Sequence, residues 1–202
     1  MSDAAKQYCY RDYLKLPVDK RFEIINGTLY DMTPAPTVEH QKVLGKLHLK
    51  IANHLENKPC SVLLAPCDVL LPDYETEETE SIKTIIQPDI FVVCDESKLQ
   101  KKHCIGAPDL IVEILSPSTA NRDRIEKSRI YYNHGVKEYW IADPDARTVE
   151  VLTPGEKYWQ IDGAYSHEEM LYSLLFANLK INLADVFGSE GGTLSPEPIG
   201  KL

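Results

Sequence analysis

The sequence predicts an α+β or mixed α/β domain, in which a central β-sheet has helices packed on it. Three observations support this prediction. Residues 37–55 repeat apolar side chains at the spacing of an amphipathic helix. Residues 22–32 are typical of a β-hairpin, because Asn26-Gly27 supplies the positive φ angles of a type I′ turn. Residues 87–93 and 108–115 are apolar runs that indicate buried strands.

Length and composition fit one globular domain. The chain has 202 residues, of which 43% are hydrophobic and 26% charged. We expect one domain over residues 1–190 and a flexible, glycine-containing tail over residues 191–202. No apolar stretch approaches the ~20 residues of a membrane span, and no apolar segment marks a secretory signal near the N-terminus. These features predict a cytoplasmic protein that does not enter a membrane.

The cysteines give no sign of a metal or disulfide framework. They are five in number and contain no C-x-x-C pair. We therefore expect neither a zinc site nor disulfides, as in a reducing cytoplasm. The five are Cys9, Cys60, Cys67, Cys94 and Cys104.

The net charge of −9 argues against non-specific binding to nucleic acid. Its distribution weakens that argument. Residues 73–80 carry five acids and no bases, and residues 148–202 carry eight acids against three bases. The rest of the chain, which holds the candidate site described below, is therefore close to neutral.

Taken in order, the first half of the chain begins with a short helix and a turn over residues 1–21. After the hairpin, Thr37 is placed to cap the long helix. Short strands follow at 62–64 and 69–71, and the acidic run at 73–80 is expected to form a solvated loop. The apolar face of the long helix is formed by Val43, Leu44, Leu47, Ile51 and Leu55.

In the second half, a polar connection over residues 95–107 with one helical turn joins the two buried strands. Ser116-Pro117 stops the second strand. Ser118 or Asn121 is placed to cap a further amphipathic helix, which ends at His134-Gly135. A final meander is expected, with strands at 138–142, 148–152 and 158–161.

Glu113 is the unusual residue in this pattern, because it interrupts a buried apolar strand. An ionised carboxylate is costly to bury unless a cation, a metal or hydrogen-bond donors meet it. Strand alternation places Asp109 on the same face, but roughly 13 Å away at ~3.3 Å per residue, too far to share an ion. Asp89 is the better partner if the two strands are neighbours. Such a carboxylate pair would suit a hard divalent cation such as Mg²⁺.

Four motifs together resemble the Uma2 family of proposed endonucleases, within the PD-(D/E)xK or restriction-endonuclease-like superfamily. The resemblance covers about Tyr13 to Tyr158, and it implies a restriction-endonuclease-like fold with a central mixed sheet flanked by helices. The motifs are Phe22-Glu-Ile-Ile-Asn-Gly-Thr-Leu-Tyr, Gln87-Pro-Asp-Ile, Gly106-Ala-Pro-Asp-Leu-Ile-Val-Glu-Ile-Leu-Ser-Pro-Ser-Thr and Gly135-Val-Lys-Glu-Tyr-Trp-Ile-Ala-Asp-Pro.

The resemblance also implies catalytic residues. The superfamily pattern is an Asp that begins one strand and a Glu-x-Lys on the next, which Asp89 and Glu113 match. Leu115 occupies the lysine position, so the sequence departs from the pattern there. The resemblance implies that the lysine has moved to the following helix, where Lys127 is the candidate because its long stem can reach back.

The implied activity is Mg²⁺-dependent hydrolysis of phosphodiester bonds in nucleic acid, expected to be DNA, by a homodimer. Asp89, Glu113 and the backbone carbonyl of Ile114 would hold the metal, for which Mn²⁺ could substitute. Lys127 would stabilise developing negative charge. Three further residues are candidates for lining the site: Gln87, His40 and Glu23.

Simpler interpretations stay open at this point. Glu113 could form a structural ion pair with Arg124 or Lys127. His40 could be a packed histidine, and Glu23 a residue of the hairpin or sheet edge. The missing Glu-x-Lys and the acidic net charge favour an alternative function, a catalytically weak or inactive protein that acts as a nucleic-acid-binding or scaffold module. The aromatic residues Tyr131, Tyr132, Tyr139 and Trp140 are expected to pack in the core.

Overall fold

The computed structural model describes residues 6–32, 35–117 and 120–188. Residues 33–34 after the hairpin, the candidate cap Ser118 and the expected tail at 191–202 lie outside these residues. The helices are α1 (Tyr10–Tyr13), α2 (Val38–Leu55), α3 (Ser128–His134) and α4 (Leu183–Phe187), with 3₁₀ turns η1 (Thr79–Ser81) and η2 (Glu96–Lys98) and a π-helical segment η3 (Arg122–Lys127).

The strands form three sheets. Their bounds are β1 (Phe22–Ile25), β2 (Thr28–Asp31), β3 (Ser61–Leu64), β4 (Asp68–Leu70), β5 (Ile85–Ile86), β6 (Ile90–Val93), β7 (His103–Ile105), β8 (Leu110–Ile114), β9 (Glu138–Asp143), β10 (Thr148–Pro154), β11 (Trp159–Ser166), β12 (Met170–Tyr172) and β13 (Lys180–Asn182).

The largest sheet is mixed, as predicted. Its order is β11-β10-β9-β8-β6-β3, in which β8 and β9 run parallel and the other neighbours antiparallel. It is not the only sheet of the described chain. The hairpin β1–β2 pairs with β5 and extends a separate five-stranded sheet of order β2-β1-β5-β4-β7, and β12 pairs with β13.

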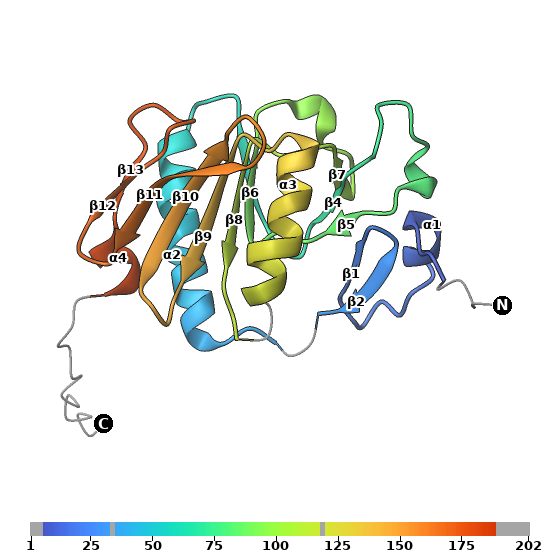
Figure 1. Ribbon diagram of the computed structural model, residues 1–202, viewed down its shortest axis with the longest axis horizontal. Helices are drawn as coiled ribbons and strands as arrows, with labels where there is room; N and C mark the ends of the chain where they lie inside the picture. Colours follow the sequence, from blue (N-terminus) through green and yellow to red (C-terminus); the bar gives the residue numbers. More distant parts are fainter. Residues whose placement is uncertain (1–5, 33–34, 118–119, 189–202) are drawn as a thin grey trace, which may run out of the picture.

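Helices cover both faces of the six-stranded sheet (Figure 1). The apolar stripe of α2, including Val43 and Leu47, packs on the face that carries Val92 and Val112. On the opposite face, Tyr131 of α3 packs in the cluster that contains Ile111. Strand alternation sends Glu113 to this second face together with Ile111, and its side chain bonds Tyr131 of α3. The expectation of a central sheet flanked by helices is therefore confirmed.

The local signals of the first half are borne out. Asn26 and Gly27 have φ angles of 48° and 78°, as a type I′ turn requires. The Thr37 side chain accepts a hydrogen bond from His40 N and caps α2.

The helix that was predicted to end at His134-Gly135 does so, since Gly135 follows its last residue with a φ of 85°. Its beginning differs from the prediction, because residues 122–127 are π-helical and Asn121 makes no side-chain cap.

Several short elements escaped prediction, among them β5, β7, β12, β13, α4 and η1. Strand β7 lies within the polar connection and pairs in parallel with β4, a long-range partner that local pattern does not reveal. The last strand of the predicted meander is also longer than expected, since β11 extends to Ser166.

The expectation of no disulfide is wrong. Cys60 and Cys94 form a disulfide with a Cα–Cα distance of 3.9 Å. Cys60 directly precedes β3 and Cys94 directly follows β6. The register of these two strands pairs Ser61 with Val93. The two cysteines therefore face each other on adjacent strands, although 34 residues separate them in the sequence. Cys9, Cys67 and Cys104 are free.

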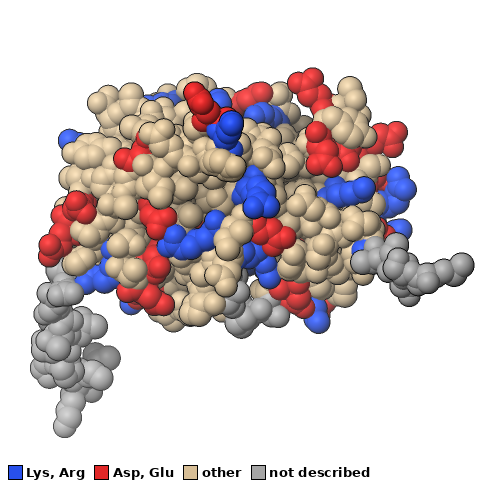
Figure 2. All heavy atoms as spheres, in the orientation of Figure 1, with Lys and Arg blue, Asp and Glu red and all other residues tan. Residues whose placement is uncertain are grey.

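Among the described residues, no helix combines the length and the apolarity needed to cross a membrane. Charges are mixed on the face that carries α3, where Lys and Arg lie among Asp and Glu (Figure 2). Acidic side chains gather over the loop between β4 and β5, at the upper right of the view. This is the acidic run at 73–80, whose residues are mostly exposed, as predicted.

Candidate active site

A cleft of about 350 Å³ lies where the hairpin, the ends of β6 and β8, the start of α2 and η3 meet. Its walls contain every residue that the sequence nominated for the site. The lining residues are Arg21, Glu23, Asp31, Met32, Ala35, Pro36, Thr37, His40, Gln87, Asp89, Glu113, Ile114, Ser116, Pro117, Arg122, Asp123 and Lys127.

Asp89 and Glu113 approach each other because their strands are neighbours. Ile90 of β6 lies opposite Val112 of β8, so the antiparallel register brings Asp89 opposite Glu113 one step further along. Asp89 N donates a long hydrogen bond to Glu113 Oε2 (3.5 Å). The predicted adjacency of the two strands is therefore confirmed, and both carboxylates line the cleft.

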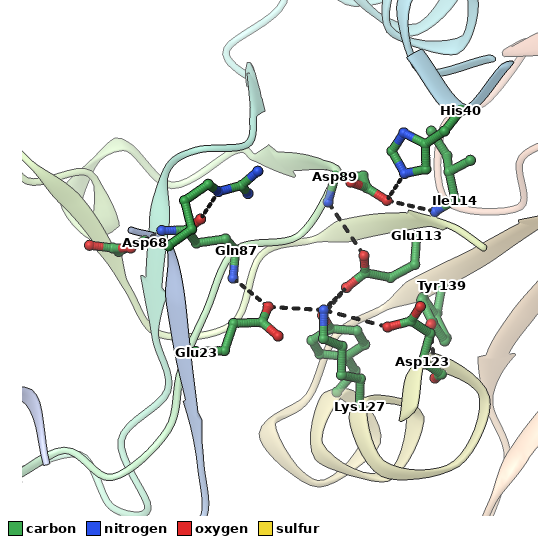
Figure 3. A network of polar contacts seen from close by, with 12 residues as sticks. Glu23, His40, Asp68, Gln87, Asp89, Glu113, Ile114, Asp123, Lys127 and Tyr139 are labelled. Atoms are coloured by element: carbon green, nitrogen blue, oxygen red, sulfur yellow. Dashed lines mark hydrogen bonds and ion pairs between the residues drawn. The ribbon is translucent and has the colours of Figure 1, made fainter. Parts of the chain in front are cut away.

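Asp89 is oriented from two directions. Its Oδ2 accepts a hydrogen bond from Ile114 N (2.8 Å) and lies 3.2 Å from His40 Nε2 (Figure 3). His40 is buried, and its Nδ1 has no hydrogen-bond partner among the described residues. The cap of α2 brings this histidine over the strand ends, because His40 N itself binds Thr37.

Glu113 is held by donors at both oxygens. Its Oε1 accepts hydrogen bonds from Lys127 Nζ (3.1 Å) and from the Tyr131 hydroxyl (2.5 Å). Only 3% of Glu113 is exposed. Burial raises the pKa of Glu113 to about 8; the nearby Lys127 opposes this shift, and neighbouring carboxylates add to it.

Lys127 is the centre of the polar network (Figure 3). Its Nζ lies 2.9 Å from Glu23 Oε1, 3.1 Å from Glu113 Oε1 and 3.5 Å from Asp123 Oδ1. Burial alone would lower the pKa of Lys127, but the three carboxylates around its ammonium raise it well above the usual value. Lys127 is therefore a buried cation.

Glu23 belongs to this network and is also a residue of the β1–β2 hairpin, as expected, but its interpretation as a sheet-edge residue is wrong. Strand β1 lies between β2 and β5, and Glu23 is 1% exposed. Its Oε1 accepts a hydrogen bond from Gln87 N (3.0 Å) as well as the contact with Lys127. Gln87 thus orients Glu23 through its backbone, and both line the cleft.

Two other acidic or basic candidates lie elsewhere. Arg124 does not pair with Glu113, because it is directed outward to Glu150 (2.8 Å) and Asp143 (3.8 Å). The Asp109 carboxylate accepts a hydrogen bond from Cys94 N and pairs with Lys137, and it lies outside the cleft.

Asp123 is the site residue that the sequence interpretation missed. In the structure it is 3% exposed and contacts Lys127 four residues later. The i,i+4 spacing of this acid and base is the sequence signal that could have identified the pair. The segment that carries both residues is π-helical, and such segments are frequent at functional sites.

The donor chemistry of the cleft fits a divalent cation. Five carboxylates, those of Glu23, Asp31, Asp89, Glu113 and Asp123, share it with one buried ammonium. Burial, with a smaller contribution from the neighbouring carboxylates, raises the pKa of Glu113, and a bound hard cation would favour its ionised form. Within the described residues, no three His, Cys, Asp or Glu side chains form a ready metal site. Two carboxylates are nevertheless sufficient for Mg²⁺, which keeps several waters.

Comparison with known proteins supports one family. Residues 10–184 match the model of the Uma2 family, described as "Putative restriction endonuclease". The "Uncharacterized protein slr1290" of Synechocystis sp. is 26% identical over 133 residues, 65% of each chain. The match therefore spans slightly less than two thirds of that relative. A crystal structure of a "putative nuclease belonging to DUF820" from Anabaena variabilis superposes with a TM-score of 0.68 at 20% identity, over 89% of this chain and 97% of that one, and so shows the same fold.

Proposed function

This chain belongs to the Uma2 family, and on that premise we propose that it is a nuclease that hydrolyses phosphodiester bonds of DNA, with Asp89, Glu113 and Lys127 as its catalytic residues. One observation carries the proposal. Three residues from separate elements, β8, η3 and the segment before β6, line one cleft, and Lys127 takes the place beside Glu113 that Leu115 leaves empty.

The metal site follows from the donor set. Asp89, Glu113 and the backbone carbonyl of Ile114 would hold Mg²⁺, or Mn²⁺ in its place, and the bound ion would activate a water and neutralise charge on the phosphate. His40 keeps the Asp89 carboxylate oriented through the contact at Oδ2. A fixed ligand of this kind costs less reorganisation on binding.

Lys127 supplies positive charge where the phosphate becomes more negative during hydrolysis. Its ammonium is held before substrate arrives, because Glu23, Glu113 and Asp123 fix its position. A preorganised cation in a water-poor site stabilises a transition state more strongly than one in bulk solvent. Gln87 contributes by orienting Glu23.

The test is cleavage of a supercoiled plasmid in Mg²⁺ or Mn²⁺, with metal binding measured by calorimetry on the same samples. We expect Asp89→Asn, Glu113→Gln and Lys127→Met to lose cleavage by at least about a hundredfold. Glu168→Gln is the matched control, because that carboxylate is 82% exposed at the surface and lies outside the cleft.

Each outcome has a distinct meaning. Cleavage and metal binding that disappear together in Glu113→Gln support the proposal. Metal binding without cleavage by the wild type contradicts it and favours the non-catalytic nucleic-acid-binding module. Absence of metal binding by the wild type means that the carboxylates serve only to neutralise the charge of the buried Lys127 ammonium.

A further inference from the structure

Two arginines of the cleft have no part in the proposed chemistry. Arg21 lies two residues before Glu23, and Arg122 directly precedes Asp123. Both line the cleft and are partly buried. Both arginines therefore share the cleft with the carboxylates that contact Lys127.

Both guanidinium groups are positioned by neutral partners. Arg21 Nε donates a hydrogen bond to Gln87 Oε1 (2.9 Å). The guanidinium of Arg122 lies over the Tyr30 ring, 4.2 Å from its centre. In the part of the chain that the structure describes, neither arginine lies within ion-pair distance of a carboxylate.

Arginines elsewhere behave differently. Arg11 Nε contacts Glu80 at 2.7 Å, and Arg124, only two residues from Arg122, contacts Glu150 at 2.8 Å. Those carboxylates neutralise the guanidinium charge. A glutamine oxygen or an aromatic ring orients a guanidinium without neutralising it, so Arg21 and Arg122 keep a full positive charge toward the cleft.

The neutral partners are themselves fixed. Gln87 Nε2 donates to Asp68 Oδ1 (2.8 Å), and Tyr13 donates to the same oxygen (2.8 Å). The Tyr30 hydroxyl donates to Glu126 Oε1 (3.0 Å). Both guanidinium groups are therefore preorganised, which reduces the entropic cost of binding a ligand.

The ligand that this arrangement suits is a chain of phosphodiesters. A cleft lined by carboxylates repels an anion, unless fixed cations offset that repulsion. Guanidinium groups bind phosphate oxygens with two parallel hydrogen bonds, a geometry that an ammonium lacks. Two preorganised guanidinium groups that enter one cleft from separate elements, η3 and the segment before β1, can each bind a phosphate of the same strand.

We propose that Arg21 and Arg122 bind the backbone phosphates next to the scissile one and so position a nucleic-acid strand in the cleft. This inference rests on the proposed nuclease function for the identity of the central phosphate. The two arginines are positioning residues, and they carry no sequence information because the contact is with the backbone.

The test is binding of a fluorescein-labelled 16-base-pair DNA duplex, and of the corresponding single strand, by fluorescence anisotropy without metal in the Glu113→Gln background. Arg21→Gln and Arg122→Gln should each weaken binding roughly five- to tenfold. Each should also reduce the slope of log affinity against log salt concentration by about one, as expected for one lost phosphate contact.

Arg124→Gln is the matched control, since it removes the same charge from the same helical segment but from a guanidinium that is already paired. It should change affinity less than twofold. Arg21→Lys and Arg122→Lys should bind more tightly than the glutamine variants but less tightly than the parent. The positive charge remains, while the two parallel hydrogen bonds of the guanidinium group are lost. Thermal unfolding of every variant identifies those that fail to fold.

The inference is overturned if folded Arg21→Gln and Arg122→Gln bind as tightly as their parent, or if neither probe binds the parent at low salt. The measurements distinguish a failure of this inference from a failure of the nuclease proposal. If the wild type does not cleave but the two variants lose affinity and salt dependence, the phosphate contacts stand and the nuclease function fails. If the wild type cleaves and the variants bind normally, only the phosphate contacts fail.

Discussion

Lys127 Nζ lies 3.1 Å from Glu113 Oε1, although the two residues are 14 positions apart and come from different elements. Leu115, at the position where the superfamily pattern has its lysine, is 7% exposed and packs in the apolar core. The strand thus keeps an apolar side chain, and η3 delivers the cation to the same carboxylate. Stability and proposed activity therefore depend on the same ion pair.

Lys127→Met should destabilise the fold strongly. The substitution leaves three buried carboxylates without their common cation, and breaking a buried pair on one side costs about 3–5 kcal/mol. Urea unfolding monitored by circular dichroism measures the free energy of unfolding. Measured above pH 8, where Glu113 is ionised in the wild type, the double variant Lys127→Met/Glu113→Gln should recover part of the loss, because one uncompensated charge is removed. A loss below about 1 kcal/mol in the single variant would contradict the buried-cation interpretation.

Glu113 predicts a defined pH dependence of stability. Burial raises its pKa in the folded state to about 8, above the 4.5 of an unperturbed glutamate. The folded state therefore binds this proton more tightly than the unfolded state. The corresponding stabilisation is complete below pH 4.5 and is lost as the pH rises through about 8.

Wild type and Glu113→Gln, compared in EDTA, isolate this effect, since other titrating groups contribute to both. The stability of the wild type relative to the variant should fall between pH 5 and pH 9. Glu168→Gln, which removes an exposed carboxylate, should leave the pH profile of the wild type unchanged. A wild-type profile parallel to that of Glu113→Gln would show that Glu113 stays ionised throughout.

Local signals in the sequence were sufficient for much of the fold. Asn26-Gly27 identified the hairpin, and the apolar stripe with Thr37 identified α2 and its start. The pairing of strands that lie far apart in the sequence was harder to predict. The hairpin joins β5 instead of the central sheet, and the opposed positions of Cys60 and Cys94 follow only from the β3–β6 register.

In the candidate site, too, residues with a local sequence signal were easier to predict than residues placed by long-range contacts. Glu113 was noticeable because a charge interrupts an apolar strand, Asp89 was its expected partner on the neighbouring strand, and Lys127 followed from the family resemblance. Glu23 was named both as a candidate for lining the site and as a hairpin residue, and its burial follows from the long-range pairing of β1 with β5. Asp123 was missed, although its i,i+4 spacing from Lys127 is a local signal.

His40 should influence metal binding through Asp89. Its Nε2 lies 3.2 Å from the Asp89 Oδ2, and partners that orient a metal ligand typically contribute 10- to 100-fold in metal affinity or activity. His40→Leu should therefore lower Mg²⁺ or Mn²⁺ affinity within about that range, measured by calorimetry, and His40→Gln should lower it less. His48, on the same helix but outside the cleft, provides the control His48→Leu. Equal affinities for wild type and His40→Leu would exclude this orienting role.

The Cys60–Cys94 disulfide should contribute to stability because it closes a loop between adjacent strands. The two cysteines are 34 residues apart, and loop-closure entropy for that length corresponds to about 3–4 kcal/mol. Dithiothreitol should therefore lower the free energy of unfolding of the wild type by an amount of that order, measured by urea denaturation at constant pH.

Thiol titration in denaturant tests the pairing itself. Of the five cysteines, Cys9, Cys67 and Cys104 are free, so three thiols should react before reduction and five after it. The double variant Cys60→Ser/Cys94→Ser should show three thiols in both conditions and no effect of dithiothreitol on stability. Five reactive thiols in the untreated wild type, purified without reductant, would show that the opposed cysteines remain reduced. That result would restore the sequence-based expectation of a protein without disulfides, and β3 and β6 would then be held together by their backbone ladder and apolar packing alone.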